Sequence, residues 1–140
     1  MDPLTSLSVA RVTVVDSSVW IAHFRGVDTA PVRKLASLDL DVGLLVGDLV
    51  LLEVLQGARD ATDARRMHDD LCQFEMVQML SAVLAIKAAA NYRLLRSLGI
   101  TIRKTPDLII GTYCIEHHHS LLHDDREFEP MRIHLGLQVH

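Results

Sequence analysis

Short runs of β-branched and aliphatic residues alternate along the chain with longer segments of helical periodicity. The run Val12–Val15 ends directly at Asp16 and predicts a buried strand. Four more short apolar runs predict further strands, at residues 42–46, 75–80, 120–123 and 135–139. Because predicted strands and helices alternate, the pattern indicates an α/β domain with a mainly parallel sheet.

Capping residues and periodicity place helices between these runs. The clearest helix lies between Ser81, a good N-cap, and Gly99, a good C-terminal stop. Along it, apolar residues recur on one face: Val83, Ile86, Ala90, Leu94 and Leu98. Thr29 and Asp48 are the expected starts of two others. The remaining pattern predicts helices within residues 20–24, 29–38, 48–56, 62–74 and 107–117.

Composition narrows the class of protein. A chain of 140 residues with 49% hydrophobic content and no low-complexity tract predicts one folded domain. The longest stretch without a charged residue or histidine is Met76–Ile86, 11 residues, which is too short to span a membrane. The N-terminus has no basic region followed by an apolar run, so no secretory signal is expected. Cys72 and Cys114 fit no metal or disulfide pattern, which predicts small core residues in a cytoplasmic protein.

The net charge of −4 argues against a protein that grips nucleic acid by bulk positive charge. The charge does not exclude an enzyme that binds phosphates through metal cations, because the carboxylates that hold such cations would themselves make the net charge negative. Eight histidines are present, and three are consecutive, His117 to His119. Consecutive side chains at a helix end point in different directions, so this run is interpreted as a solvated helix terminus rather than a zinc site.

Four carboxylates stand alone in apolar surroundings: Asp16, Glu53, Asp107 and Asp125. Taken singly, the three aspartates could merely cap helices or close turns, and Glu53 could reach solvent or an arginine. Taken together they favour a site, because the carboxyl ends of parallel strands converge on one edge of a sheet, where ligands bind. Oxygen ligands without cysteine or histidine partners select Mg²⁺ or Mn²⁺, ions that serve phosphoryl-transfer chemistry.

Two other phosphate chemistries are excluded by the first strand end. A phosphatase of the haloacid dehalogenase type needs Asp-x-Asp there, and Ser18 stands in place of the second aspartate. A phosphorelay receiver needs an acidic pair at this end, which Ser17 and Ser18 do not supply.

Four segments resemble, in order, the motifs of PIN domains and of VapC toxins in particular. The four acids are separated by 37, 54 and 18 residues, and the resemblance covers residues 12–139. Any one motif is weak evidence, whereas four in the right order are strong. The segments are Val14–Ile21, Leu51–Gly57, Gly99–Ile110 and Leu121–Phe128.

The resemblance implies a PIN-like three-layer α/β/α sandwich with a mainly parallel central sheet at 12–140. Residues 1–11 lie outside the resemblance, and because this segment lacks periodicity we expect a flexible tail. The resemblance further implies Mg²⁺- or Mn²⁺-dependent ribonuclease activity, a homodimer and a cognate VapB-type antitoxin. Ser17 would orient Asp16 through its hydroxyl. Glu127 stands where the family often has aspartate. The resemblance also assigns catalysis and metal binding to four acids: Asp16, Glu53, Asp107 and Asp125.

The predicted function is therefore a cytoplasmic endoribonuclease toxin of a type II toxin–antitoxin pair. Two alternatives stay open: a PIN nuclease of RNA processing without an antitoxin, and a catalytically inactive PIN binding module, which the presence of all four acids disfavours. Arg103 and Lys104, close to Asp107, are expected to hold RNA phosphates. The antitoxin is expected to insert an arginine that makes a bidentate contact with two of the carboxylates, and to pack an amphipathic helix against residues 49–55 and 20–24.

Overall fold

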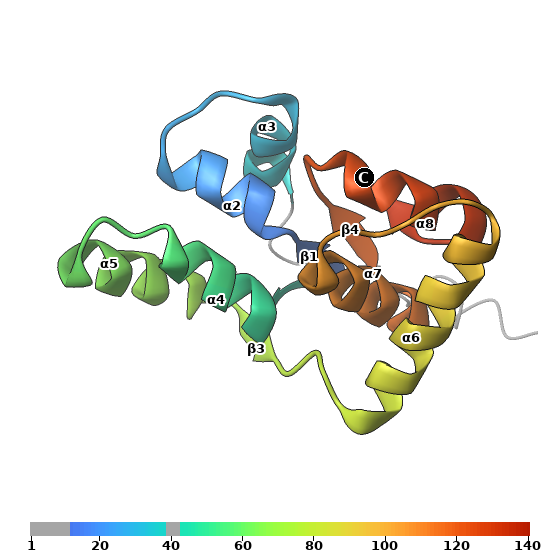
Figure 1. The fold of residues 1–140 in the computed structure, drawn as a ribbon. Helices are drawn as coiled ribbons and strands as arrows, with labels where there is room; N and C mark the ends of the chain where they lie inside the picture. The colour runs from blue at the N-terminus through green and yellow to red at the C-terminus, as the bar shows by residue number, and fades with distance from the viewer. Residues whose placement is uncertain (1–11, 39–42) are drawn as a thin grey trace, which may run out of the picture.

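The computed structural model describes residues 12–38 and 43–140, and its centre is a five-stranded sheet (Figure 1). The strand order is β3-β2-β1-β4-β5, and all four neighbouring pairs are parallel. This confirms the predicted parallel α/β class. The strands are β1 (Thr13–Val15), β2 (Leu44–Gly47), β3 (Glu75–Val77), β4 (Ser120–Leu122) and β5 (Gln138–Val139).

The helices form two groups with the sheet between them, which gives the predicted three-layer sandwich (Figure 1). The first group is α2 (Ser17–Phe24), α3 (Ala30–Ser37), α4 (Asp48–Gln56) and α5 (Ala61–Leu71). The second group is α6 (Ala82–Ser97), α7 (Thr105–His117), the short 3-10 helix η2 (Arg126–Phe128) and α8 (Glu129–Leu135). None of the helices described is long and apolar enough to cross a membrane.

The predicted caps are present, whereas the predicted strand lengths are partly wrong. The Thr29 hydroxyl accepts from the amide of Val32, and the Ser81 hydroxyl accepts from the amide of Leu84. Strand β3 ends at Val77, three residues before the predicted limit. Residue 135, predicted to begin the last strand, instead ends α8, and only residues 138 and 139 pair with the sheet. Residues 1–11 and Val42 lie outside the described part of the chain.

Helix α6 is apolar on two opposite faces. Its inner face packs into the core through Leu84, Ala88 and Leu95. The apolar face that the sequence analysis identified points outward, and Ile86 at its centre is 71% exposed. Several large apolar side chains are thus exposed on one side of a helix that also carries Lys87, Arg93 and Arg96, and such a patch marks a candidate interaction surface. We call it the α6 face, made of Val83, Ile86, Ala90, Leu94 and Leu98.

The two cysteines differ in environment. Cys114 is fully buried in α7, as predicted for a small core residue. Cys72, which follows α5, is exposed, so the prediction that it also belongs to the core is wrong. The sequence of α5 explains this difference, because only one stripe of that polar helix, Asp63, Met67 and Leu71, is buried.

Candidate active site

Three of the four predicted acids lie together beyond the carboxyl end of β1. One oxygen atom each from Asp16, Glu53 and Asp107 can be chosen so that the three lie within 4.8 Å of one another. Asp16 follows β1 directly and caps α2, Glu53 lies within α4, and Asp107 lies in the first turn of α7. One strand–helix junction, one helix start and one helix interior therefore converge on one point beyond the carboxyl end of a parallel strand, where parallel-sheet geometry favours a site.

Two oxygen atoms of this cluster are buried without a partner. Asp16 is 2% exposed and Asp107 is 3% exposed. Oδ1 of Asp16 and Oδ2 of Asp107 have no hydrogen-bond partner among the described residues. An unpaired buried carboxylate oxygen is costly, and a bound divalent cation would satisfy both atoms at once. The donor set, oxygen only, fits Mg²⁺ or Mn²⁺.

Burial and mutual repulsion raise the pKa values of the carboxyl groups in this cluster. Burial, together with the neighbouring carboxylates of Asp16 and Asp125, raises the pKa of Asp107 to about 7. Burial also raises the pKa of Asp16, although hydrogen bonds from Ser18 oppose it. The pKa of Glu53 is raised by burial and by the charge of Asp16. A cation that binds here must displace protons near neutral pH.

Two adjacent serines hold the cluster, and their roles differ from the prediction. The Ser17 hydroxyl donates to Oε1 of Glu53 at 3.1 Å. The Ser18 hydroxyl and amide both donate to Oδ2 of Asp16, at 2.6 and 3.1 Å. The expectation that the Ser17 hydroxyl orients Asp16 is therefore wrong, because that contact belongs to Ser18. The sequence contained a sign of this contact: Asp16 was a candidate N-cap, and an N-cap aspartate accepts a hydrogen bond from the amide two residues further on, which here is Ser18.

Asp125 does not join the other three acids. Its Oδ2 accepts from the Lys104 ammonium at 3.1 Å, and its Oδ1 accepts from the Glu127 amide at 3.0 Å, which caps η2. Although partial burial pushes the pKa of Asp125 upward, these two contacts hold it below its ordinary value. The cause is local: β4 ends at Leu122, three residues earlier, and the chain turns before Asp125.

The predicted basic residues border the cluster. Lys104 precedes α7 as its N-cap residue, and its side chain is 60% exposed. Arg103 is also exposed, and its backbone amide donates to Oε2 of Glu127 at 3.3 Å. Sequence reasoning missed His123, whose Nδ1 accepts from the amide of Asp125. Burial lowers the pKa of His123, which keeps the ring neutral and able to accept.

Within residues 12–38 and 43–140, the consecutive histidines belong to no group of residues that could hold a metal ion. His117 ends α7, His118 adopts a left-handed backbone at φ 56°, and the rings of His117 and His119 stack at 5.6 Å. Among the residues that the structure describes, the acid triad is the one cluster with metal-ligand geometry.

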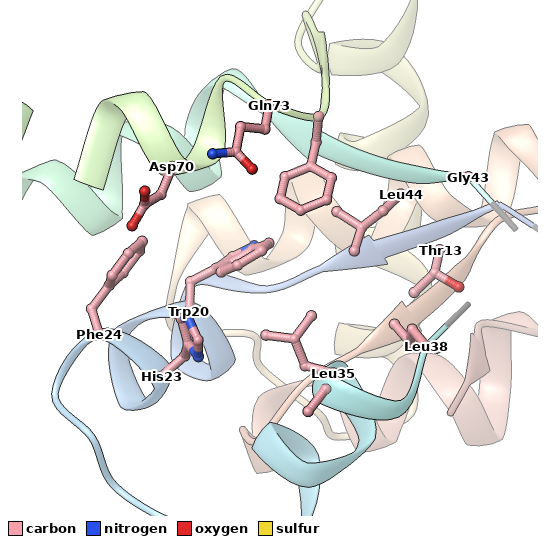
Figure 2. A pocket seen from close by; sticks show the side chains of 12 residues that line it. Thr13, Trp20, His23, Phe24, Leu35, Leu38, Gly43, Leu44, Asp70 and Gln73 are labelled. Atoms are coloured by element: carbon pink, nitrogen blue, oxygen red, sulfur yellow. The ribbon is translucent and has the colours of Figure 1, made fainter. Parts of the chain in front are cut away.

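An apolar cleft of about 270 Å³ lies between α2, α3 and α5, away from the carboxylates (Figure 2). Thr13 and Leu44, the first residues of β1 and β2, lie at one end of it, whereas Asp16 follows the last residue of β1. Much of its lining is aromatic and aliphatic, with Trp20, Phe24, Leu35 and Leu38 labelled in Figure 2. Polar side chains, those of His23, Asp70 and Gln73, line the rest of the cleft, and none of the four predicted acids is among the lining residues.

The parallel sheet with buried carboxylates beyond its central strand agrees with the resemblance found in the sequence. The PIN domain family profile matches residues 13–133, and the chain belongs to this family. It is 25% identical over 129 residues to "VapC ribonuclease Mb1587" of Mycobacterium bovis, covering 90% of this chain and 96% of that one. The identity to "Ribonuclease VapC11" of Mycobacterium tuberculosis is also 25%, with the same coverage.

Solved structures share the fold at low identity. A structure of VapBC2 from Rickettsia felis bound to a promoter DNA fragment matches with a TM-score of 0.75 and 16% identity, covering 92% of this chain and 97% of that one. A structure of VapBC-1 from nontypeable Haemophilus influenzae matches with a TM-score of 0.72 and 13% identity, covering 92% and 96%. The predicted PIN-like sandwich is thereby confirmed.

Proposed function

We propose that this protein is a metal-dependent endoribonuclease, the toxin of a type II toxin–antitoxin pair in the cytoplasm. The observation that carries the proposal is the cluster of Asp16, Glu53 and Asp107, with two buried oxygen atoms unpartnered among the described residues. The relatives that cover nearly all of the chain are named ribonucleases, which supports RNA as the substrate.

Asp16 and Asp107 would hold Mg²⁺ or Mn²⁺, with Glu53 as a third ligand or as a base. When bound, the ion acidifies water and neutralises charge on the phosphodiester. The chain itself supplies orientation: Ser18 fixes Asp16, and Ser17 fixes Glu53 through Oε1. Glu53 is only half buried, so its Oε2 can face solvent and accept the proton of an attacking water.

Substrate would be held by its backbone rather than by its bases. Arg103 and Lys104 border the carboxylates and are exposed, and both can contact RNA phosphates. This local pair of cations offsets the overall charge of −4, which would otherwise repel RNA. Contacts of this kind fix the position of the strand without reading its sequence.

A VapB-type antitoxin would neutralise the enzyme across this same edge. An inserted arginine can fork onto two carboxylates and replace the cation with a fixed positive charge. Helix α4 supports an apolar contact beside the cluster, because Leu52 is 53% exposed and its neighbours Leu51 and Leu55 are half buried. Ile21 and Phe24 of α2 extend the apolar surface, which suits an amphipathic helix.

A second copy of this chain would cover the α6 face in a homodimer. Ile86 and Leu94 lie four residues on either side of the small residue Ala90. An antiparallel pairing about a two-fold axis at Ala90 brings Ile86 of one copy against Leu94 of the other. A two-fold interface requires such self-complementarity, and the alanine allows the two backbones to approach closely.

The proposed function is tested by expression of the chain alone and together with its neighbouring gene, followed by mapping of new RNA ends. We expect growth arrest and new ends for the chain alone, and neither for Asp107→Asn. Co-expression of the neighbouring gene should suppress both effects. New RNA ends that persist at full level with Asp107→Asn would contradict the proposal.

A further inference from the structure

We propose that Lys104 is a built-in cation of the active site, which occupies Asp125 and limits the carboxylates to one divalent ion. The inference rests on the proposed function, since it concerns the same metal site. It assigns to Lys104 a role beyond the RNA contact: its ammonium pairs with Asp125, a carboxylate that would otherwise be free to help hold a second ion.

The four acids are divided by how well their oxygen atoms are satisfied. Both oxygen atoms of Asp125 are engaged, one by the Lys104 ammonium at 3.1 Å and one by the Glu127 amide at 3.0 Å. Asp16 and Asp107, by contrast, each leave one buried oxygen without a partner in the described structure. A cation would therefore satisfy the unpartnered oxygen atoms of Asp16 and Asp107, whereas Asp125 is already neutralised by the ammonium of Lys104.

The position of Lys104 is fixed by the elements it joins. It is the N-cap residue of α7, three positions before Asp107, so its backbone moves with a cluster ligand. Its partner Asp125 is the N-cap residue of η2. The ion pair thus ties together two caps at the edge of the site, and its geometry is set by two helix starts rather than by flexible surface chain.

The charge of Lys104 acts on the whole cluster. Besides its direct contact with Asp125 at 3.1 Å, it places a positive charge beside the other carboxylates of the site. A second divalent ion near Asp125 would have to displace this charge or bind beside it.

A lysine in this place can also serve the reaction. In sites with two metal ions, the second ion stabilises charge on the leaving oxygen. An ammonium has three N–H donors, and the Asp125 contact uses one of them. The side chain is 60% exposed, so the other donors can meet a phosphate oxygen without breaking the pair.

A second lysine provides the matched control. Lys87 of α6 pairs with Glu116 of α7 at 2.8 Å and is 47% exposed, close to the exposure of Lys104. Neither residue of that pair belongs to the acid cluster. Any effect of removing a lysine charge in general should therefore appear equally in Lys87→Met.

The test is a Mn²⁺ titration of the metal-free protein without RNA, by isothermal calorimetry and by electron paramagnetic resonance of free Mn²⁺. We expect one bound ion for the wild type, for Lys87→Met and for Lys104→Arg. Lys104→Met should release Asp125 and bind a second, weaker ion, and Lys104→Met with Asp125→Asn should return to one. Circular dichroism and the thermal midpoint check that each variant folds.

Two results would overturn the inference: two ions in the wild type, or a single ion in a folded Lys104→Met protein. A parallel RNA cleavage assay separates this inference from the proposed function. Wild-type protein that cleaves RNA and binds two ions leaves the proposed function standing and removes the role of Lys104. Wild-type protein that neither binds Mn²⁺ nor cleaves RNA contradicts the proposed function, and the inference with it.

Discussion

The hydroxyl of Ser17 is directed to Glu53 and not to the neighbouring Asp16: it donates to Oε1 of Glu53 at 3.1 Å across 36 positions of the chain. This contact joins the start of α2 to the interior of α4. Glu53 lies within a helix rather than at a helix start, and the serine contact aligns it with the other two carboxylates. The orientation of the cluster therefore depends on a residue that is itself neither acid nor ligand.

Ser17→Ala is expected to slow RNA cleavage by roughly tenfold or more, because a hydrogen bond to a charged group is worth about 1.5–3 kcal/mol. The fold should survive, since the α2 cap is made by Asp16 and Ser18. Initial cleavage rates at saturating Mg²⁺ measure the effect. Ser37→Ala is the control, because that hydroxyl bonds only its own helix at an exposed position. A wild-type rate for Ser17→Ala would remove the positioning role.

The stability of the metal-free protein should fall as pH rises from about 4 to about 7. Asp107 has a pKa of about 7 in the folded protein against an ordinary value of 3.8, so the folded state binds more protons across this window. The loss amounts to at most roughly 4 kcal/mol and is complete above the folded pKa. Thermal midpoints measured in a chelator between pH 4 and 8 test this.

Adding Mg²⁺ and the Asp107→Asn variant to the same thermal-midpoint experiment shows whether the acid cluster causes the pH dependence. Mg²⁺ should raise the midpoint of the wild type at pH 8, because it binds only the folded state. Asp107→Asn should have a higher midpoint than the wild type in chelator at pH 8, and should lose most of the response to Mg²⁺. A midpoint for Asp107→Asn below that of the wild type under these conditions would mean that repulsion within the cluster is not the governing effect.

The sequence predicts the α/β class and the caps at Thr29 and Ser81, because each depends on local spacing. It also singles out the three acids that the structure brings together. The placement of Asp125 was not predictable, since strand length decides whether a residue after a strand reaches the edge, and β4 ends early. Periodicity also cannot say which face of α6 points inward. When both faces are apolar, only the tertiary packing decides.

Charge on the α6 face should dissociate the proposed homodimer. Ile86→Glu buries a carboxylate in the interface of both copies at once, since two-fold symmetry repeats each substitution. Light scattering after size exclusion should give a dimer for the wild type and a monomer for Ile86→Glu. Val27→Glu is the control, because Val27 is also exposed, at 48%, but lies between α2 and α3. A wild-type monomer at micromolar concentration would contradict the interface.

The inserted arginine of the antitoxin should account for inhibition more than for affinity. Replacing it with alanine should restore RNA cleavage in the complex while the apolar helix contact keeps most of the binding. Salt should weaken this contact only modestly, because a desolvated bidentate pair is poorly screened. Cleavage assays and binding isotherms on the same complex compare the two effects. A complex in which the inhibitor leaves Asp16 and Asp107 open to solvent would refute this mechanism.

The central claim is that the buried acid triad cleaves RNA with a divalent ion, and purified protein tests it most directly. RNA should be cut by the wild type with Mg²⁺ or Mn²⁺, left intact when the ion is chelated, and left intact by a folded Asp107→Asn protein with the ion present. Cleavage that continues at the wild-type rate in chelator, or with Asp107→Asn, would contradict the account.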